Sequence, residues 1–326
     1  MRCRNLSCAD MESPTLITTQ ALSTSRLRYA LPSLLIVALS TADASAKIRP
    51  AYIDDNLLCR AQPLPAVVQH LSGEAWKLDR QGQASVLKEG MTIDEQEGVK
   101  TSPDAFVSLL LGDGSRVVLP SGSQVRLHVA PERSVPQVTL EQGQVEAYVI
   151  KRTSEHDRFQ IVTPVGVLGV RGTHFRVHDD GGQSVLEVLD GQVAVKRQTN
   201  ARPAEDEVKV GARQGLLFKT QGALQPVELL AAPKLIGQNG QKGEAPVWSL
   251  YLRPLPGARR YRAQVATDKS FMNIQQENFS TAPKLSFTGL KASFYHVRVS
   301  AYDEHGLEGE TGVYDIFYYP PTAQVR

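Results

Sequence analysis

Two histidines, His174 and His178, have the H-x-x-x-H spacing at which a helix would turn both imidazoles toward one zinc ion. The residues around them, THFRVHD, alternate between polar and apolar side chains, which is typical of a strand. Positions four residues apart in a strand lie roughly 13 Å from each other, whereas zinc holds each nitrogen at roughly 2 Å. The sequence therefore predicts no metal site at this pair, and no cofactor.

Ser85 and Lys88 form an S-x-x-K pattern, which supplies the nucleophile in penicillin-recognising serine enzymes. Those enzymes place the pattern at the start of a helix, with S-D-N and K-T-G partner motifs that do not occur in this chain. Acidic residues such as Glu141 and Asp190 stand at expected turns. Glycosidases need two carboxyl groups at a defined separation, and the sequence does not assign any two of these residues as such an acid and base. We therefore predict that the protein is not an enzyme. A polysaccharide-active enzyme is an alternative hypothesis that ranks third, behind a binding module and a signalling protein.

Arg171 lies in the stretch Gly169-Val170-Arg171-Gly172, where its guanidinium could bind a carboxylate or a phosphate through two hydrogen bonds. A structural role is the favoured interpretation, because glycines let a backbone turn a corner and Arg171 could donate to carbonyls there. This interpretation predicts a positive φ at Gly172. The run Asp179 to Gly182 is interpreted as a hairpin turn.

Aromatic residues gather near the C-terminus and could stack on sugar rings wherever they are exposed. We expect most of them to face a core, with Tyr318 and Tyr319 as the best candidates for an exposed patch. The group consists of Tyr295, Tyr302, Tyr314, Phe317, Tyr318 and Tyr319.

The composition limits the possible partners. The chain has 326 residues, with 36 Lys and Arg against 34 Asp and Glu, and a formal charge of +2. So little net charge argues against binding to nucleic acid. Of the three cysteines, Cys3 and Cys8 precede an expected export signal, so a mature chain would keep Cys59 alone and form no internal disulfide.

An export signal is predicted at residues 1–46. Arg26 and Arg28 lead into the apolar stretch 30–39, and Ala44 and Ala46 supply the small residues of an A-x-A cleavage site. A membrane anchor needs roughly 20 apolar residues, about twice the length of this stretch. We therefore expect no transmembrane span in the mature chain, and a periplasmic or outer-envelope location in a Gram-negative bacterium.

The rest of the chain is predicted to be all-β. Short apolar runs broken by Gly, Asp-Gly and Pro fill residues 67–228, after a lead-in at 47–66. Repeated strand, turn, strand units, with turns at 112–115, 120–123, 141–143 and 190–191, favour an elongated β roll or solenoid. Residues 229–245 are interpreted as a flexible linker, and residues 246–320 as a small β-sandwich around Trp248.

The middle region resembles the FecR domain. The resemblance rests on an ordered series of motifs from Gly90 to Val193, including LLLGDGS at 109–115, LEQGQV at 140–145, VLGVRGTHF at 167–175 and VLDGQV at 188–193. The motif residues, which we expect to be structural, are Thr101, Asp113, Gly114, Ser115, Gly143, Thr163, Pro164, Arg171, Gly172, Thr173, Phe175 and Gly191. The C-terminal region is similar to a fibronectin type III domain.

The FecR resemblance implies either signalling or binding. The founding member of the family carries an iron-siderophore signal to a sigma factor and needs a cytoplasmic helical segment, which is not found before the apolar stretch here. The main hypothesis is therefore a non-catalytic exported envelope protein that acts as a binding or scaffolding module. The alternative is a sensor-regulator in iron or siderophore signalling.

The partner expected from the sequence is an envelope protein or a glycan, and self-association is possible. No ligand-binding residue is assigned from the sequence. Exposed sheet edges and turns are expected to form the working surface, because unpaired backbone groups can accept a partner strand.

Overall fold

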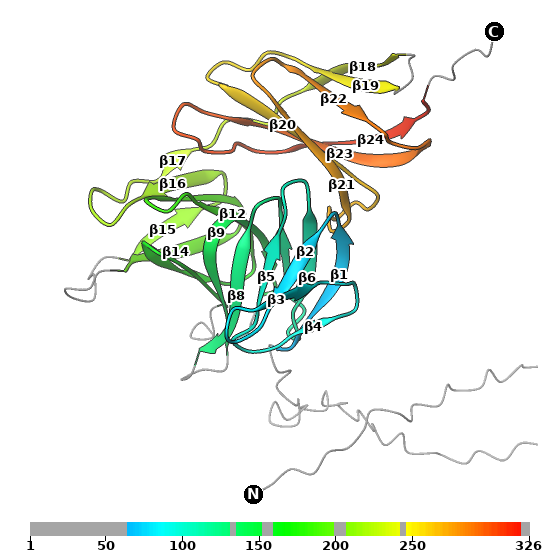
Figure 1. Cartoon of the computed structure of the whole chain (residues 1–326). Coiled ribbons are helices and arrows are strands. Elements are labelled where there is room, and N and C mark those ends of the chain that lie inside the picture. Colours follow the sequence, from blue (N-terminus) through cyan, green and yellow to red (C-terminus); the bar gives the residue numbers. More distant parts are fainter. Residues whose placement is uncertain (1–63, 131–134, 152–158, 199–206, 242–245, 321–326) are drawn as a thin grey trace, which may run out of the picture. The chain divides into compact units, whose positions relative to one another are not determined.

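The structure is a computed structural model that describes residues 64–130, 135–151, 159–198, 207–241 and 246–320. The predicted export signal at residues 1–46, Cys59 and most of the lead-in lie outside the described residues. The described residues belong to one compact unit, and their regular elements are all strands (Figure 1). This confirms the predicted all-β class. No helix that could cross a membrane is found in this part of the chain.

The first region, called the roll here, contains the strands up to Glu228. They are β1 (Ala66–Ser72), β2 (Ala75–Leu78), β3 (Ala84–Val86), β4 (Thr92–Ile93), β5 (Gly98–Thr101), β6 (Phe106–Leu110), β7 (Arg116–Leu119), β8 (Gln124–Ala130), β9 (Val135–Val149), β10 (Phe159–Thr163), β11 (Gly166–Val170), β12 (Thr173–Asp179), β13 (Ser184–Asp190), β14 (Gln192–Arg197), β15 (Val208–Gly211), β16 (Gln214–Phe218) and β17 (Val227–Glu228).

The roll consists of two sheets that share strand β9. Sheet A runs in the order β4-β1-β6-β7-β9-β12-β13-β16-β17. Sheet B runs in the order β3-β2-β5-β8-β9-β10-β11-β14-β15. One apolar core joins side chains of both sheets, such as Val107 and Phe175 of sheet A with Val125 and Leu168 of sheet B. Each such buried side chain contributes roughly 1.5–3 kcal/mol.

The chain changes from one sheet to the other at single residues with a positive φ. Gly172 (φ +59) separates β11 in sheet B from β12 in sheet A, as expected, and Gly191 (φ +84) separates β13 from β14. Gly143 (φ +82) lies within β9, whose first half pairs in sheet B and whose second half pairs in sheet A. These glycines therefore form corners between the two sheets.

The turns predicted at 120–123, 141–143 and 190–191 do not form hairpins. Strands β7 and β8, and likewise β13 and β14, pair with other strands instead of each other, and β9 continues through residues 141–143. A positive φ serves a hairpin and a corner equally well, so the local sequence does not distinguish them. The turns at 112–115 and 179–182 do join paired strands, as predicted.

The second region, called the sandwich here, has a three-stranded and a four-stranded sheet. Sheet C has the order β18 (Leu235–Gln241), β19 (Val247–Leu252) and β22 (Lys284–Thr288), and sheet D the order β21 (Ile274–Ser280), β20 (Arg260–Ala266), β23 (Ser293–Tyr302) and β24 (Gly312–Tyr318). Trp248 lies in the core between them and donates a hydrogen bond to Gln238 Oε1 at 2.7 Å. The fibronectin resemblance stays a prediction.

Two expectations for the C-terminal part were wrong. Residues 229–245 are not a linker without structure, because they contain β18, which pairs along β19. Their Gly and Gln residues suggested a linker, but β18 is mostly exposed and needs few apolar side chains. Tyr318 is buried and stacks on Trp248, with ring centroids 4.8 Å apart, whereas Tyr319 is exposed as expected.

Replacement of Gly143 by alanine tests the corner of β9. A Cβ there would meet the Gly122 carbonyl oxygen at 2.6 Å and Ser123 Cα at 2.8 Å, so backbone must move. We expect a loss of unfolding free energy clearly above the roughly 1–2 kcal/mol that a left-handed conformation costs a residue with a Cβ. The control is Gly181→Ala, because Gly181 has φ +88 and no atom within 4 Å of its Cβ position. Equal losses for both variants in denaturant titrations would contradict the corner.

Candidate functional site

Charged side chains gather where sheet A of the roll packs against sheet D of the sandwich. Glu146, Arg176 and Glu187 stand on β9, β12 and β13, beside residues that fill the core of the roll. Successive side chains along a strand point to opposite faces of the sheet, so these three charged side chains point away from the core of the roll. There they are covered by Arg262 and Arg298 of sheet D, and all five side chains are nearly inaccessible to solvent.

Glu146 and Arg298 form an ion pair between the two regions. The guanidinium donates to both carboxylate oxygens of Glu146, at 2.7 and 2.5 Å, and His174 Nε2 lies 2.7 Å from the first of them. Burial alone would raise the pKa of Glu146, but Arg298 and His174 outweigh it and hold that pKa well below its usual value. Both members of the pair are therefore ionised. Removal of either side chain would leave the other as an unpaired buried charge, which is strongly destabilising.

A second group of charges surrounds Glu308, which follows β23. Arg176 of the roll contacts the Glu308 carboxylate at 2.7 Å and donates to the main-chain oxygens of Glu308 and Gly309. Arg262 of the sandwich reaches the same carboxylate at 3.0 Å. One carboxylate thus holds a guanidinium from each region.

Gln264 joins the two groups into one network. Its side-chain oxygen accepts from Arg298 Nε at 2.6 Å, and its nitrogen donates to Glu277, which pairs with Arg262 at 2.7 Å. The interface network therefore consists of Glu146, Arg298, Gln264, Glu277, Arg262, Glu308 and Arg176. Its three guanidinium groups are matched by three carboxylates, so its formal charges cancel.

Glu187 is a fourth buried carboxyl beside this balanced set. Its Oε1 accepts a hydrogen bond from the Glu308 main-chain nitrogen at 3.1 Å, and its Oε2 lies 4.0 Å from Arg176 Nε. Burial, only partly offset by Arg176 and reinforced by the Glu308 charge, raises the pKa of Glu187 to about 8. The pKa of Glu308 moves the other way, to about 2, because Arg176 and Arg262 outweigh its burial. Glu187 is therefore protonated at neutral pH, and Glu308 is ionised.

Apolar contacts flank the interface network. Phe106 and Val118 of the roll form one buried cluster with Phe271, Met272 and other residues of the sandwich. Gly215 of β16 leaves room for Leu307, whose Cδ2 atom lies 2.6 Å from the position a Cβ would take. Roll and sandwich thus share an interface that contains both apolar packing and paired charges.

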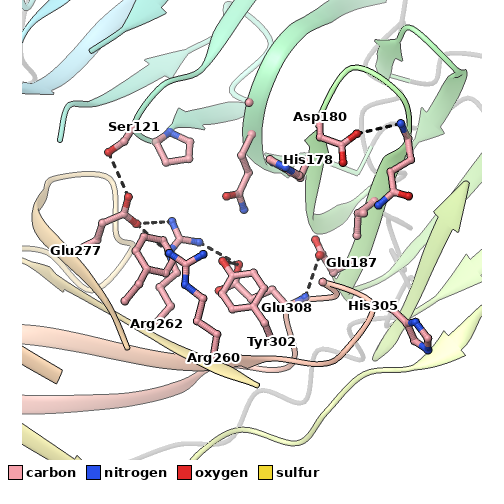
Figure 2. Close-up of a pocket in the computed structure, with 17 residues that line it drawn as sticks. Ser121, His178, Asp180, Glu187, Arg260, Arg262, Glu277, Tyr302, His305 and Glu308 are labelled. Carbon is pink, nitrogen blue, oxygen red and sulfur yellow. Dashed lines mark hydrogen bonds and ion pairs between the residues drawn. The ribbon is translucent and has the colours of Figure 1, made fainter. Parts of the chain in front are cut away.

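A cleft of about 400 Å³ opens beside this interface. Figure 2 shows His178 and Asp180 of the roll on one side and Arg260, Tyr302 and His305 of the sandwich on the other. Glu187, Arg262, Glu277 and Glu308 line its buried part and are bound to one another there or to Ser121. Its volume lies in the range of small-ligand pockets, which is roughly 300–1,000 Å³.

The structure disperses the residues of the family motifs over the roll. They lie mostly at corners, turns and strand ends: Thr101, Asp113, Gly114, Ser115, Gly143, Thr163, Pro164, Arg171, Gly172, Thr173, Phe175 and Gly191. Of these, only Gly143 lines the cleft. Thr101 Oγ1, for example, donates to the Pro120 oxygen at 2.7 Å and accepts from the Ser123 nitrogen at 2.8 Å. Their assignment as structural residues stays a prediction.

The histidine and serine patterns are placed on strands, as expected. His174 and His178 both stand on β12, where His174 stacks on Tyr148 with ring centroids 3.9 Å apart. Ser85 lies on the exposed strand β3. Within the described ranges, no group of three or more His, Cys, Asp or Glu residues has a metal-binding arrangement.

Sequence reasoning missed the residues of the interface network. The available signal was a charged residue flanked by apolar ones, as in Val297-Arg298-Val299 and Val145-Glu146-Ala147. Such alternation indicates a strand with one polar face, and a polar face is ordinarily exposed to water. That this face is covered by a second sheet follows only from the tertiary structure.

Replacement of Glu187 by glutamine tests its protonation. Between the usual carboxyl pKa near 4.5 and the folded-state pKa of about 8, only the folded chain keeps this proton, so stability falls as pH rises through that window. One such proton lowers the unfolding free energy by up to about 1.4 kcal/mol per pH unit. The side chain of Glu187→Gln is neutral at every pH. We therefore expect the melting temperature of this variant to fall less than that of the wild type as the pH rises from about 5 to about 8.

The matched control is Glu304→Gln. Glu304 is exposed and pairs weakly with Arg259 at 3.5 Å, so this variant should retain the wild-type slope of melting temperature against pH. An unchanged slope for Glu187→Gln would show that Glu187 is ionised in the folded chain.

Comparison with known proteins gives a family match within the roll. The family model described as "FecR protein" matches residues 97–194, which extend from β5 into β14. No curated protein matches the chain.

Among solved structures, the chain is similar to a "putative anti-sigma factor" from Parabacteroides distasonis ATCC 8503, determined at 2.50 and 1.65 Å resolution. Each structure is 18% identical, with a TM-score of 0.34, over 40% of this chain and 59% of that protein. The chain thus spans less than two thirds of the length of that protein. Residues 97–194 match the FecR family.

Proposed function

We propose that this chain is a non-catalytic binding protein of the cell envelope, and that its roll and sandwich act as one binding unit. The observation that carries the proposal is the cleft beside the interface, whose exposed polar groups come from both regions. The interface network supports it, because paired buried charges fix the orientation of one region against the other. A site built from two docked elements is preorganised, which lowers the entropy lost on binding.

The proposed location rests on the sequence before Lys47. Two arginines, an apolar stretch and an A-x-A site are arranged as in an export signal. The mature protein would then begin near Lys47 and reside in the periplasm or the outer envelope. Cell fractionation with N-terminal sequencing tests this part, and a full-length protein in the cytoplasm would overturn it.

The working surface proposed here differs from the sheet edges expected from the sequence. Edge strands such as β3 and β24 do end sheets B and D, but the exposed polar side chains that converge on one place do so in the cleft. Pockets that combine a few polar groups from several elements are the usual sites for ligands.

Site-specific crosslinking in intact cells tests the cleft as the binding surface. A photoreactive residue at Gln183, on the wall of the cleft, should capture a specific partner. The same residue at Ser85, which is exposed on β3 and does not line the cleft, is the matched control. We expect the Gln183 adduct, identified by mass spectrometry, to be missing at Ser85. Identical adducts at both positions, or none at Gln183, would contradict the proposal.

A role as a sensor-regulator in iron or siderophore signalling is the second candidate. The match of residues 97–194 to the FecR family favours it. Deletion of the gene would then change iron-dependent transcription, and unchanged transcript levels across iron concentrations would exclude it.

A further inference from the structure

Arg260 is an exposed cation that lines the cleft without a counter-ion. Its guanidinium lies 4.0 Å from the centroid of the Phe279 ring and 6.0 Å from that of Tyr302. Within the described part of the chain, it has no hydrogen bond or ion pair. Its neighbour Arg259 pairs with Glu304, and Arg262 pairs with Glu277 and Glu308. The ring contact therefore holds Arg260 in place, and its hydrogen-bond donors remain for a ligand.

The other charges around the cleft are already bound. Glu277 pairs with Arg262 at 2.7 Å, and Glu308 pairs with Arg262 at 3.0 Å and with Arg176 at 2.7 Å. The Asp180 carboxylate accepts hydrogen bonds from the main-chain nitrogens of Gly182 and Gln183, in the turn after β12. The cleft thus offers one unpaired guanidinium, which matches a ligand with a single negative charge.

The remaining lining favours a ligand rich in hydroxyl groups. The imidazoles of His178 and His305 line the cleft (Figure 2). The amides of Gln144 and Gln183 line it as well, and all four side chains can donate and accept hydrogen bonds. The apolar side chains of Pro120, Val185 and Phe279 also line the cleft. An apolar carboxylate such as a fatty acid would leave these polar groups without partners, which is costly.

We propose that the cleft binds an acidic sugar, a uronic acid unit of a glycan, whose carboxylate pairs with Arg260. This inference rests on the proposed function and names its ligand. The planar fork of the guanidinium matches a carboxylate through two hydrogen bonds. A phosphate dianion carries more negative charge than one guanidinium balances, so the single cation favours the carboxylate.

Calorimetric titration of the mature chain with galacturonic acid, which has one carboxylate, tests this inference, with its neutral counterpart galactose as the reference sugar. We expect binding of the acidic sugar only, and a loss of affinity of about tenfold or more in Arg260→Ala. Arg260→Lys keeps the charge and loses the fork, so it should bind with intermediate affinity. Arg259→Ala is the matched control, because Arg259 is the adjacent exposed arginine and does not line the cleft; its affinity should equal that of the wild type.

Melting temperatures of all variants show whether they remain folded, since Arg260 is exposed and its loss should change them little. The inference is overturned if the wild type does not bind galacturonic acid, or if Arg260→Ala binds it as tightly as the wild type. Equal or tighter binding of inorganic phosphate, or of the dipeptide Gly-Gly through its carboxylate, also overturns the assignment to an acidic sugar. In each of these cases, a cleft-specific crosslink at Gln183 would leave the proposed binding function in place.

Discussion

The structure depends on the pairing of charges buried between its two β regions. An ionised carboxylate or guanidinium loses its hydration on burial, at a cost of several kcal/mol, and only a well-placed partner offsets this. Glu146 therefore requires Arg298, and Glu308 requires both Arg176 and Arg262. Because the pairs Glu146–Arg298 and Arg176–Glu308 each join the roll to the sandwich, they specify one orientation of the sandwich on the roll, and that orientation forms the cleft. Fixed orientation is thus the structural basis of the proposed binding site.

The roll can present these charges because its chain turns corners without loops. Gly143 lets β9 pass from sheet B to sheet A within one strand, which places Glu146 on the outer face of sheet A. The corner at Gly172 brings Arg176 onto the neighbouring strand β12, and Glu146 and Arg176 are direct partners across that pair. The glycine corners thus determine the register in which β9 and β12 pair. That register in turn determines where the buried charges lie.

The sequence predicted the all-β class, the strands and the positive φ of Gly172, because short β-branched runs and glycine have local physical causes. It did not predict which strands pair, so the change of sheet at Gly191 was missed and β18 was interpreted as part of a linker. The charges of the candidate site were missed for a related reason. Arg298 between two valines indicates a polar face on a strand, and only the tertiary structure shows that another polar face covers it.

The central claim, that roll and sandwich are one cooperative unit, can be tested with the two tryptophans, one in each region. Trp76 lies on β2 of the roll and Trp248 in the core of the sandwich. In a Trp76→Phe chain, fluorescence reports the sandwich alone, whereas far-ultraviolet circular dichroism reports both regions. Unfolding in denaturant, followed by both signals, should give one coincident transition, since docked regions that share buried charges unfold together. Two separated transitions, with the sandwich unfolding independently of the roll, would contradict the account.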